Sequence, residues 1–192
     1  MTLIMSIYKI IQKLKQKYRN FEINSQNKLF KKVMLKNNKI VNNDVKLGHN
    51  VMISGHNKLN IGKNVHIGTN SFIRADGGLI IGNNVFISRN VVIYTTSHNY
   101  NGKRLPFDDT NIEKKVIIED NVWIGMNVTI SPGTIIGEGS IIALGSRIYG
   151  KIAPGSIVGD GSQQIGTRDM QHYDKLKKNK NFSKEDGKEY NE

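Results

Sequence analysis

The feature of this sequence that most limits its fold is an isoleucine repeated at every sixth position. An α-helix repeats its apolar face about every 3.6 residues, and a half-buried strand repeats it every two. A period of six fits neither and is typical of short strands joined by sharp corners, each strand pointing one apolar residue inward. The sequence therefore predicts a parallel β-helix of hexapeptide repeats. The isoleucines that follow this spacing without a slip are Ile118, Ile124, Ile130, Ile136, Ile142 and Ile148.

The same spacing extends upstream and is broken in two places. Runs of it begin at Ile61 and at Ile81, and the segment 76–79 between them adds two residues, which predicts a bulge or a widened corner. After Ile93 the next isoleucine in the series is Ile118, so a long insertion covers residues 99–115 and has no apolar period. Long loops in an otherwise economical repeat tend to carry function.

Several segments of this region resemble the hexapeptide-repeat acyltransferases, and most closely their maltose/galactoside acetyltransferase-like branch, which includes capsule and polysaccharide O-acetyltransferases. The resemblance covers residues 50–160. It implies an all-β solenoid, folded as a left-handed parallel β-helix and assembled as a homotrimer, which transfers an acetyl group from acetyl-CoA. The segments that carry it are 94–100 (YTTSHNY), 116–125 (VIIEDNVWIG), 130–137 (ISPGTIIG) and 153–156 (APGS).

We divide the chain into a basic N-terminal helical segment (1–39), the β-helix (40–160) and a polar C-terminal tail (161–192). Residues 3–19 predict an amphipathic helix that stops at Asn20, followed by a weaker helical pattern over residues 29–34. We expect these helices to cap the open end of the solenoid, as terminal units must. The alternative is peripheral contact with the inner membrane surface through the apolar stripe. The tail predicts a short helix or disorder.

Charge and cysteine content narrow the classes of function. The net charge is +12, and residues 1–39 hold ten Lys or Arg against one acid, Glu22. Such a segment can attract nucleic acid, anionic lipid or an acidic glycan, but no nucleic-acid-binding motif accompanies the charge, so we expect no nucleic-acid partner. The absence of cysteine excludes a thiol nucleophile and a Cys-ligated metal. Without a signal peptide or a transmembrane run, we expect a cytoplasmic protein.

His98 is the predicted catalytic base. Acetyl transfer to a hydroxyl needs a group that removes the proton of the acceptor as its oxygen attacks the thioester carbonyl, and histidine titrates near neutral pH. His98 stands at the mouth of the insertion, where the resemblance implies the catalytic histidine. His49, His56 and His66 lie on earlier coils, and we interpret them as corner residues.

The resemblance also implies where acetyl-CoA would bind. Trp123, the only tryptophan, would line the acyl channel with its indole N–H near the thioester sulfur; a structural aromatic at a subunit contact is the alternative. Tyr149 would be a further donor-site side chain, and Lys151 and Arg168 would meet the phosphates of the nucleotide. The residues expected to border the pantetheine arm, in a groove between adjacent subunits, are Gly125, Met126, Ala143, Leu144, Gly145 and Ser146.

The sequence departs from the family after its last coil. Residues 159–164 (GDGSQQ) replace the usual Gly-x-Pro-Ala-basic exit, so the basic residue expected near Gln164 is missing and the contacts to the nucleotide end are in doubt. For the acceptor, the resemblance points to polar side chains before and within the insertion, although the first two could simply pair with each other. These acceptor candidates are Arg74, Asp76, Asn99, Tyr100 and Lys103.

The predicted function is O-acetylation of a sugar hydroxyl on a capsular, exopolysaccharide or lipopolysaccharide glycan. Backbone amides or Trp123 would stabilise the oxyanion or the leaving thiolate, and without a Ser-His-Asp or Cys-His set we expect no acyl-enzyme. One alternative is the same transfer to serine, a nucleotide-linked amino sugar or an antibiotic. Another is a metalloenzyme like the γ-type carbonic anhydrases, although His98 lacks the histidine partners of a three-His zinc site, so we expect no metal. The third is a non-catalytic β-helix that serves in assembly.

Overall fold

The computed structural model describes residues 2–37, 39 and 44–182, without the side chains of residues 2–4. Ile40, where we expect the β-helix domain to begin, lies outside these residues, as does the end of the predicted tail, 183–192. The boundaries of the three predicted segments therefore stay predictions.

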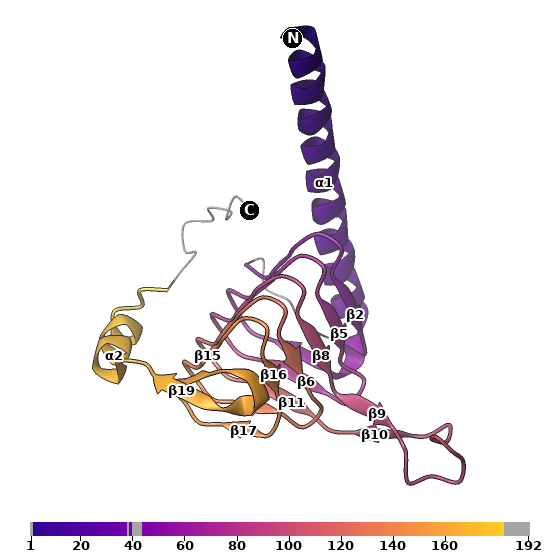
Figure 1. Ribbon diagram of the computed structural model, residues 1–192, viewed down its shortest axis with the longest axis vertical. Coiled ribbons are helices and arrows are strands. Elements are labelled where there is room, and N and C mark those ends of the chain that lie inside the picture. Colours follow the sequence, from indigo (N-terminus) through magenta and orange to yellow (C-terminus); the bar gives the residue numbers. More distant parts are fainter. Residues whose placement is uncertain (1, 38, 40–43, 183–192) are drawn as a thin grey trace.

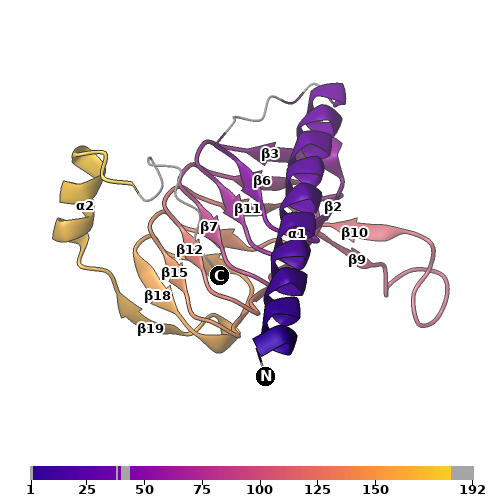
Figure 2. The ribbon, with the colours of Figure 1, turned by 90° about the horizontal axis from the view of Figure 1, so that it is seen from above.

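A long helix, a stack of short strands and a short helix follow one another along the chain (Figure 1). Helix α1 (Thr2–Lys36) crosses one end of the stack, and helix α2 (Met170–Lys178) lies beside it near the other end. A hairpin projects from the side of the stack that is opposite to α2 in both views (Figure 2). The predicted β-helix is confirmed as a solenoid with helices at its two ends.

Three sheets of parallel strands form the sides of the solenoid, and each complete coil adds one strand to each sheet. Sheet A consists of β1 (Lys46–Leu47), β4 (His66–Ile67), β7 (Phe86–Ile87), β12 (Trp123–Ile124), β15 (Ile141–Ile142) and β18 (Ser156–Val158), with antiparallel β19 (Gln164–Thr167) at its end. Sheet B consists of β2 (Met52–Ser54), β5 (Phe72–Arg74), β8 (Val92–Tyr94), β13 (Thr129–Ile130) and β16 (Arg147–Ile148). Sheet C consists of β3 (Leu59–Ile61), β6 (Leu79–Ile81), β11 (Val116–Ile118), β14 (Ile135–Ile136) and β17 (Lys151–Ile152).

The repeated isoleucines form the core. All six positions from Ile118 to Ile148 are at most 2% exposed, and each stacks on the same position of the next coil, as Ile124 does between Ile87 and Ile142. The Val, Thr or Ser four places after an isoleucine is buried as well, as at Val128 and Thr134. The period of six therefore arises because each strand points one isoleucine into the core and the corner that follows it buries a second, smaller side chain.

Asparagine makes many of the sharp corners. Seven corner asparagines have φ between +51° and +59°, the left-handed region that asparagine tolerates better than other residues with a side chain. Their amides also bond from coil to coil, as Asn90 does to Asn127 (3.0 Å). These residues are Asn50, Asn64, Asn70, Asn84, Asn90, Asn121 and Asn127.

The irregular parts of the repeat all fall on the corner between sheets B and C, the B–C corner. In the first coil it holds a 3₁₀ turn, η1 (His56–Lys58), and in the second coil it holds the widened turn predicted at residues 76–79. The third coil carries the long insertion at the same corner. A corner can absorb extra residues because the register of the strands on either side is unaffected.

Helix α1 corrects the prediction of two N-terminal helices. It runs without a break through Asn20, because asparagine inside a helix costs at most about 0.7 kcal/mol and the segment contains neither glycine nor proline. Its second half caps the first coil: Phe30 and Met34 are buried, and Asn27 bonds both backbone groups of Leu47 at 2.8 Å. Its first half, residues 5–21, is exposed throughout, so capping explains only half of the helix. No helix among the described residues is long and apolar enough to span a membrane.

The C-terminal segment closes the other end of the solenoid. A second 3₁₀ turn, η2 (Asp160–Ser162), leads back into β19, which pairs with β18. The Asp160 carboxylate accepts hydrogen bonds from the Arg147 guanidinium and backbone, which hold the pKa of Asp160 well below its usual range. Helix α2 confirms the short helix expected in the tail.

A matched pair of substitutions at Asn127 tests the role of the left-handed corners. Asn127→Val and Asn127→Gly both remove the amide contact with Asn90, but only valine resists a φ of +57°. We expect the valine variant to lower the free energy of unfolding by about 1–2 kcal/mol more than the glycine variant, measured by urea denaturation. Equal losses would show that the amide ladder, and not backbone conformation, is what selects asparagine.

Candidate functional site

The insertion at the B–C corner is an antiparallel hairpin. Strands β9 (Thr96–His98) and β10 (Asn111–Glu113) pair, with His98 opposite Asn111. This corrects the expectation of a loop without regular structure: three residues per strand are too few to produce a recognisable period. An ion pair of 2.7 Å between Glu113 and Lys58 ties the base of the hairpin to the first coil.

His98 lies at the end of β9 and stacks on Phe107. The ring centroids are 4.0 Å apart and the planes are 8° from parallel, and both side chains are exposed. A flat ring on one face leaves the two imidazole nitrogens free to approach an acceptor hydroxyl in the plane of the ring. Phe107 was not among the predicted site residues. The signal in the sequence was that Phe107 is the only phenylalanine in a polar insertion.

The tip of the hairpin is held by short polar contacts. The Asp108 carboxylate accepts hydrogen bonds from the hydroxyl and backbone N–H of Thr110 and from the backbone N–H of Lys103, and the Thr110 hydroxyl is the main cause of the lowered pKa of Asp108. The Asn99 amide donates to Thr110 at 3.0 Å. Asn99 therefore shapes the hairpin, whereas the Tyr100 side chain is exposed and available to a ligand.

Arg74 and Asp76 lie at the same B–C corner, one coil before the hairpin. Arg74 Nε is 3.4 Å from the Asp76 carboxylate, which also accepts a hydrogen bond of 2.7 Å from Ser54. The guanidinium lies 6.0 Å from the centre of the Tyr94 ring. The five predicted acceptor residues thus lie at one corner or in the hairpin that leaves it, and Arg74 and Asp76 do pair, as the simpler interpretation proposed.

The residues predicted to border the pantetheine arm lie on a different corner, between sheets A and B. The turn at Gly125 and Met126 stacks directly on the turn at residues 143–146, through hydrogen bonds from Gly125 N to Ile142 O (2.9 Å) and from Gly145 N to Met126 O (2.8 Å). A Cβ at Gly125 would come within 2.7 Å of the Leu144 nitrogen, so only glycine allows this approach. Leu144 itself is 72% exposed. The A–B corner therefore presents two stacked turns of exposed backbone, Gly125–Met126 and residues 143–146, with the apolar side chain of Leu144 on their surface. We call these stacked turns the donor step.

Trp123 projects from the outer face of sheet A and is 49% exposed. It lines a pocket of 480 Å³ between this face and α2, together with Phe86, Arg168 and Tyr173. A volume of this size is sufficient for a small ligand. Sheet A, with the strand β12 that carries Trp123, and the hairpin, with the strand β9 that ends at His98, lie on opposite sides of the molecule (Figure 2).

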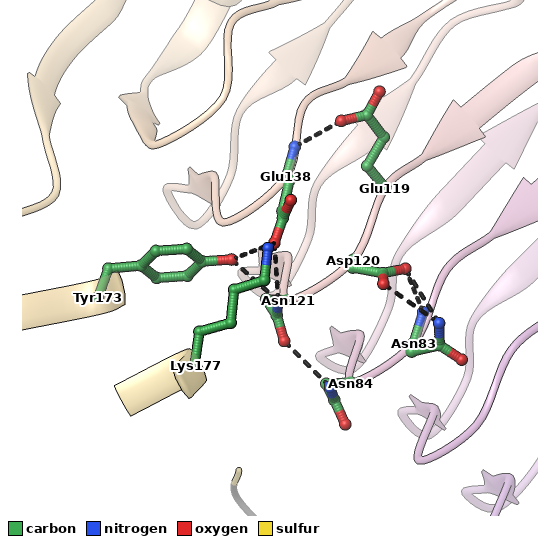
Figure 3. Close-up of polar contacts among 8 residues, drawn as sticks. All are labelled: Asn83, Asn84, Glu119, Asp120, Asn121, Glu138, Tyr173 and Lys177. Carbon is green, nitrogen blue, oxygen red and sulfur yellow. Dashed lines mark hydrogen bonds and ion pairs between the residues drawn. The ribbon is translucent and has the colours of Figure 1, made fainter. Parts of the chain in front are cut away.

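A polar network fixes α2 over this pocket (Figure 3). The Tyr173 hydroxyl donates to Glu138 at 2.7 Å and accepts from Asn121 at 2.9 Å, and Lys177 bonds the same Glu138 oxygen. Asn84 donates to Asn121 at 3.1 Å, which joins the network to the corner ladder. Burial tends to raise the pKa of Glu138, but the hydrogen bonds from Lys177, Tyr173 and Asn121 outweigh it and lower that pKa.

Arg168 lies in the same pocket as Trp123, with its guanidinium 5.6 Å from the Tyr173 ring. Burial lowers its pKa, and its buried Nε has no hydrogen-bond partner among the residues that the structure describes. The resemblance gave Trp123 the thioester and Arg168 the nucleotide, which are opposite ends of an extended molecule. The structure brings Trp123 and Arg168 to one pocket, and the role proposed for each stays a prediction.

The other predicted nucleotide contact, Lys151, is exposed on sheet C and does not line the pocket that contains Arg168. Tyr149 lies on the B–C corner, two coils beyond the hairpin, where its backbone N–H and carbonyl both bond the Ser162 hydroxyl (2.8 and 2.7 Å). The unusual segment 159–164 therefore closes the last coil instead of forming a basic exit. The predicted donor residues as a set are not brought together by one chain.

The three other histidines of the solenoid have structural surroundings. His49 contacts Glu22 at 2.9 Å, His56 packs beside Phe30, and His66 stacks on Phe86, on a strand and not on a corner as we expected. Among the residues that the structure describes, no three His, Cys, Asp or Glu side chains are grouped as a metal site would require.

A substitution at Phe107 tests the aromatic stack. Phe107→Leu removes the ring current above the imidazole, so we expect the His98 ring-proton NMR resonances to move downfield while those of the other histidines stay in place. Leu105→Ala, at a side chain of the same hairpin that is 94% exposed, is the matched control. It should leave the ring-proton resonances of all five histidines unchanged. His98 resonances that do not respond to Phe107→Leu would show that the rings do not stack in solution.

Two models of hexapeptide families match the chain. One is described as "Bacterial transferase hexapeptide (six repeats)" and matches residues 115–150, and the other as "Hexapeptide repeat of succinyl-transferase" and matches residues 58–95. The hairpin lies between the two matched segments. A search of curated proteins gives no match.

Solved structures with the same fold include three acyltransferases. AntD, an N-acyltransferase from Bacillus cereus in complex with dTDP and 3-hydroxybutyryl-CoA, is 18% identical with a TM-score of 0.60 over 73% of this chain and 90% of its own. A hexapeptide-repeat acetyltransferase from Vibrio cholerae O1 biovar eltor, complexed with acetyl coenzyme A, is 24% identical with a TM-score of 0.59 over 77% and 90%. A maltose O-acetyltransferase from Clostridium difficile 630 is 23% identical with a TM-score of 0.59 over 80% and 88%.

At these identities the structural likeness establishes the fold. The sequence matches and the buried period of six agree with it. The chain is therefore a β-solenoid, and residues 58–95 and 115–150 of it are similar to hexapeptide-repeat families.

Proposed function

We propose that this protein is an acyl-CoA-dependent acyltransferase that acetylates a sugar hydroxyl of a surface glycan in the cytoplasm, with acetyl-CoA as donor and His98 as general base. The observation that carries the proposal is the hairpin at the B–C corner. It is the one long insertion in an otherwise regular solenoid, and it presents an exposed imidazole beside a cluster of polar side chains. Two of the solved structures with this fold hold acyl-CoA or acetyl-CoA, which supports the donor.

In the proposed reaction, His98 takes the proton of the acceptor hydroxyl as its oxygen attacks the thioester carbonyl. The negative charge that develops on the carbonyl oxygen would be stabilised by a backbone N–H or by the Trp123 indole N–H, and coenzyme A thiolate leaves. Phe107 would hold the imidazole plane, and Arg74 would favour an acidic sugar beside the hairpin.

We further propose that the site is completed between copies of the chain in a homotrimer. One chain places His98 on the B–C corner, and the donor step, Gly125 with Leu144, on the A–B corner. In a cyclic assembly the B–C corner of one copy can face sheet A and the A–B corner of the next. Such an arrangement would bring His98 to Trp123 and to the donor, which a single chain does not do.

The alternative acceptor with specific support is a nucleotide-linked amino sugar. AntD, which shares the fold, is an N-acyltransferase whose structure contains dTDP. An amine loses its proton during attack as a hydroxyl does, so His98 would serve in either reaction.

Acetyl-CoA turnover with mass detection of the product tests the reaction. We expect the native protein to acetylate a member of a panel of bacterial surface oligosaccharides, and His98→Ala to be slower by on the order of 10²–10⁴-fold, the usual contribution of a general base. His172→Ala, at an exposed histidine on α2, is the control and should keep the native rate. Equal rates in native protein and His98→Ala would remove His98 from the mechanism, and acetylation only of nucleotide-linked amino sugars would favour the alternative acceptor.

Mixing two inactive variants tests the shared site. His98→Ala removes the base, and Ala143→Phe fills the proposed donor groove from a half-buried position at the A–B corner. If each site takes its base from one copy and its groove from the next, random mixed trimers from equal amounts should recover about a quarter of native activity. Mixed trimers that stay inactive, although mass spectrometry shows both chains in them, would place the whole site within one chain.

A further inference from the structure

The first half of α1 presents an apolar stripe that no other residue described by the structure covers. Every residue from Met5 to Phe21 is exposed, and this part of the helix extends past the solenoid (Figure 1). Met5 and Tyr8 lie outside the stripe, but at about 100° per residue the other six large exposed apolar side chains between residues 5 and 21 fall within roughly one third of the circumference. They are Ile7, Ile10, Ile11, Leu14, Tyr18 and Phe21.

The stripe points away from the solenoid. The second half of α1 docks through a face that includes Asn27, Phe30 and Met34, and the same helical geometry places this face roughly opposite to the stripe. Copies that associate through the sides of their solenoids would therefore leave the stripe open. It needs an occupant that lies beyond the capped end of the molecule.

The charge around the stripe identifies that occupant. Residues 5–21 contain five cations and no acid, with Lys15 and Lys17 on the two flanks of the stripe. Further along the helix the same outward face continues as exposed Lys28, Lys32 and Lys36, one turn apart. An apolar face bordered by lysines is the pattern of a helix that lies in the interface of an anionic membrane.

We propose that α1 is a membrane-surface anchor that lays residues 7–21 in the interface of a bilayer containing anionic lipid, with the lysines that follow on its headgroups. The apolar side chains would enter the interface, and the solenoid would stand on the membrane with its capped end toward the lipid. The inference does not depend on the proposed acetyl transfer.

A second copy of the helix is the other candidate occupant, because Ile7, Ile11, Leu14, Tyr18 and Phe21 are spaced alternately by four and three residues, as in a coiled coil. Charge argues against it. Pairing two stripes would bring two segments of five cations together, and the nearest acid, Glu22, is already in contact with His49. An anionic membrane supplies the missing negative charge.

Vesicle flotation of the full-length protein tests the proposal. The vesicles are phosphatidylcholine alone, or phosphatidylcholine with about one third phosphatidylglycerol. We expect binding to the anionic vesicles only, weakened by salt. The double substitution Ile11→Glu and Leu14→Glu places two charges in the stripe and should lower the vesicle partition coefficient at least about tenfold.

The matched control is Gln12→Glu with Gln16→Glu. It adds the same two charges in the same turns of the helix but on the opposite face, and both glutamines are exposed. We expect its partition coefficient to stay within about threefold of the native value. Far-UV circular dichroism and the emission of Trp123, the only tryptophan, verify that each variant is folded.

Two results would overturn the proposal. An equal loss of binding in both double variants would mean that net charge alone attracts the protein and that the stripe has no part. A native protein that ignores anionic vesicles, and whose lipid-free mass by light scattering falls in Ile11→Glu with Leu14→Glu but not in the control, would identify a second copy as the occupant.

Discussion

The parallel hydrogen bonding of each coil to the next is the interaction on which the rest of this structure depends. Strands of two or three residues have no stability of their own, and here each one is held by its neighbours and by an isoleucine stacked on the isoleucines of adjacent coils. An extra residue within a strand would turn its isoleucine out of the core. Added chain is therefore tolerated at corners, and that is where the widened turns and the hairpin occur.

This constraint explains how a regular scaffold carries an irregular site. The hairpin leaves from one corner without disturbing the strands on either side, and its own contacts, from Lys58 to Glu113 at the base and around Asp108 at the tip, give it a defined shape. The stacked turns at Gly125 and Leu144 occupy another corner. A triangular solenoid keeps such features apart within one chain, which is why assembly of several copies is central to the proposed chemistry.

The two ends of the solenoid solve the problem of an open core in different ways. At one end α1 covers the first coil with Phe30 and Met34 and then continues well beyond it. At the other end the chain turns back through η2 and β19, and α2 is fixed at the side by Tyr173 and Glu138. At the C-terminal end, η2, β19 and α2 all pack on the solenoid. At the N-terminal end, only the second half of α1 does so, and the first half exposes the apolar and basic surface for which we propose a membrane partner.

The sequence by itself determined the solenoid, because a period of six is typical of stacked hexapeptide coils, and it located the insertion and placed His98 at its mouth. It did not reveal the hairpin, since strands of three residues are too short for a period, nor the continuity of α1 through Asn20, where a weak propensity yields to the rest of the helix. Only the tertiary structure decided which residues share a corner. It placed Phe107 on His98, put Trp123 and Arg168 in one pocket beside sheet A, and placed the hairpin on the opposite side of the molecule. The reason is that spatial neighbours in a solenoid depend on how coils stack and how the terminal segments dock. The local order of residues does not reveal either of these.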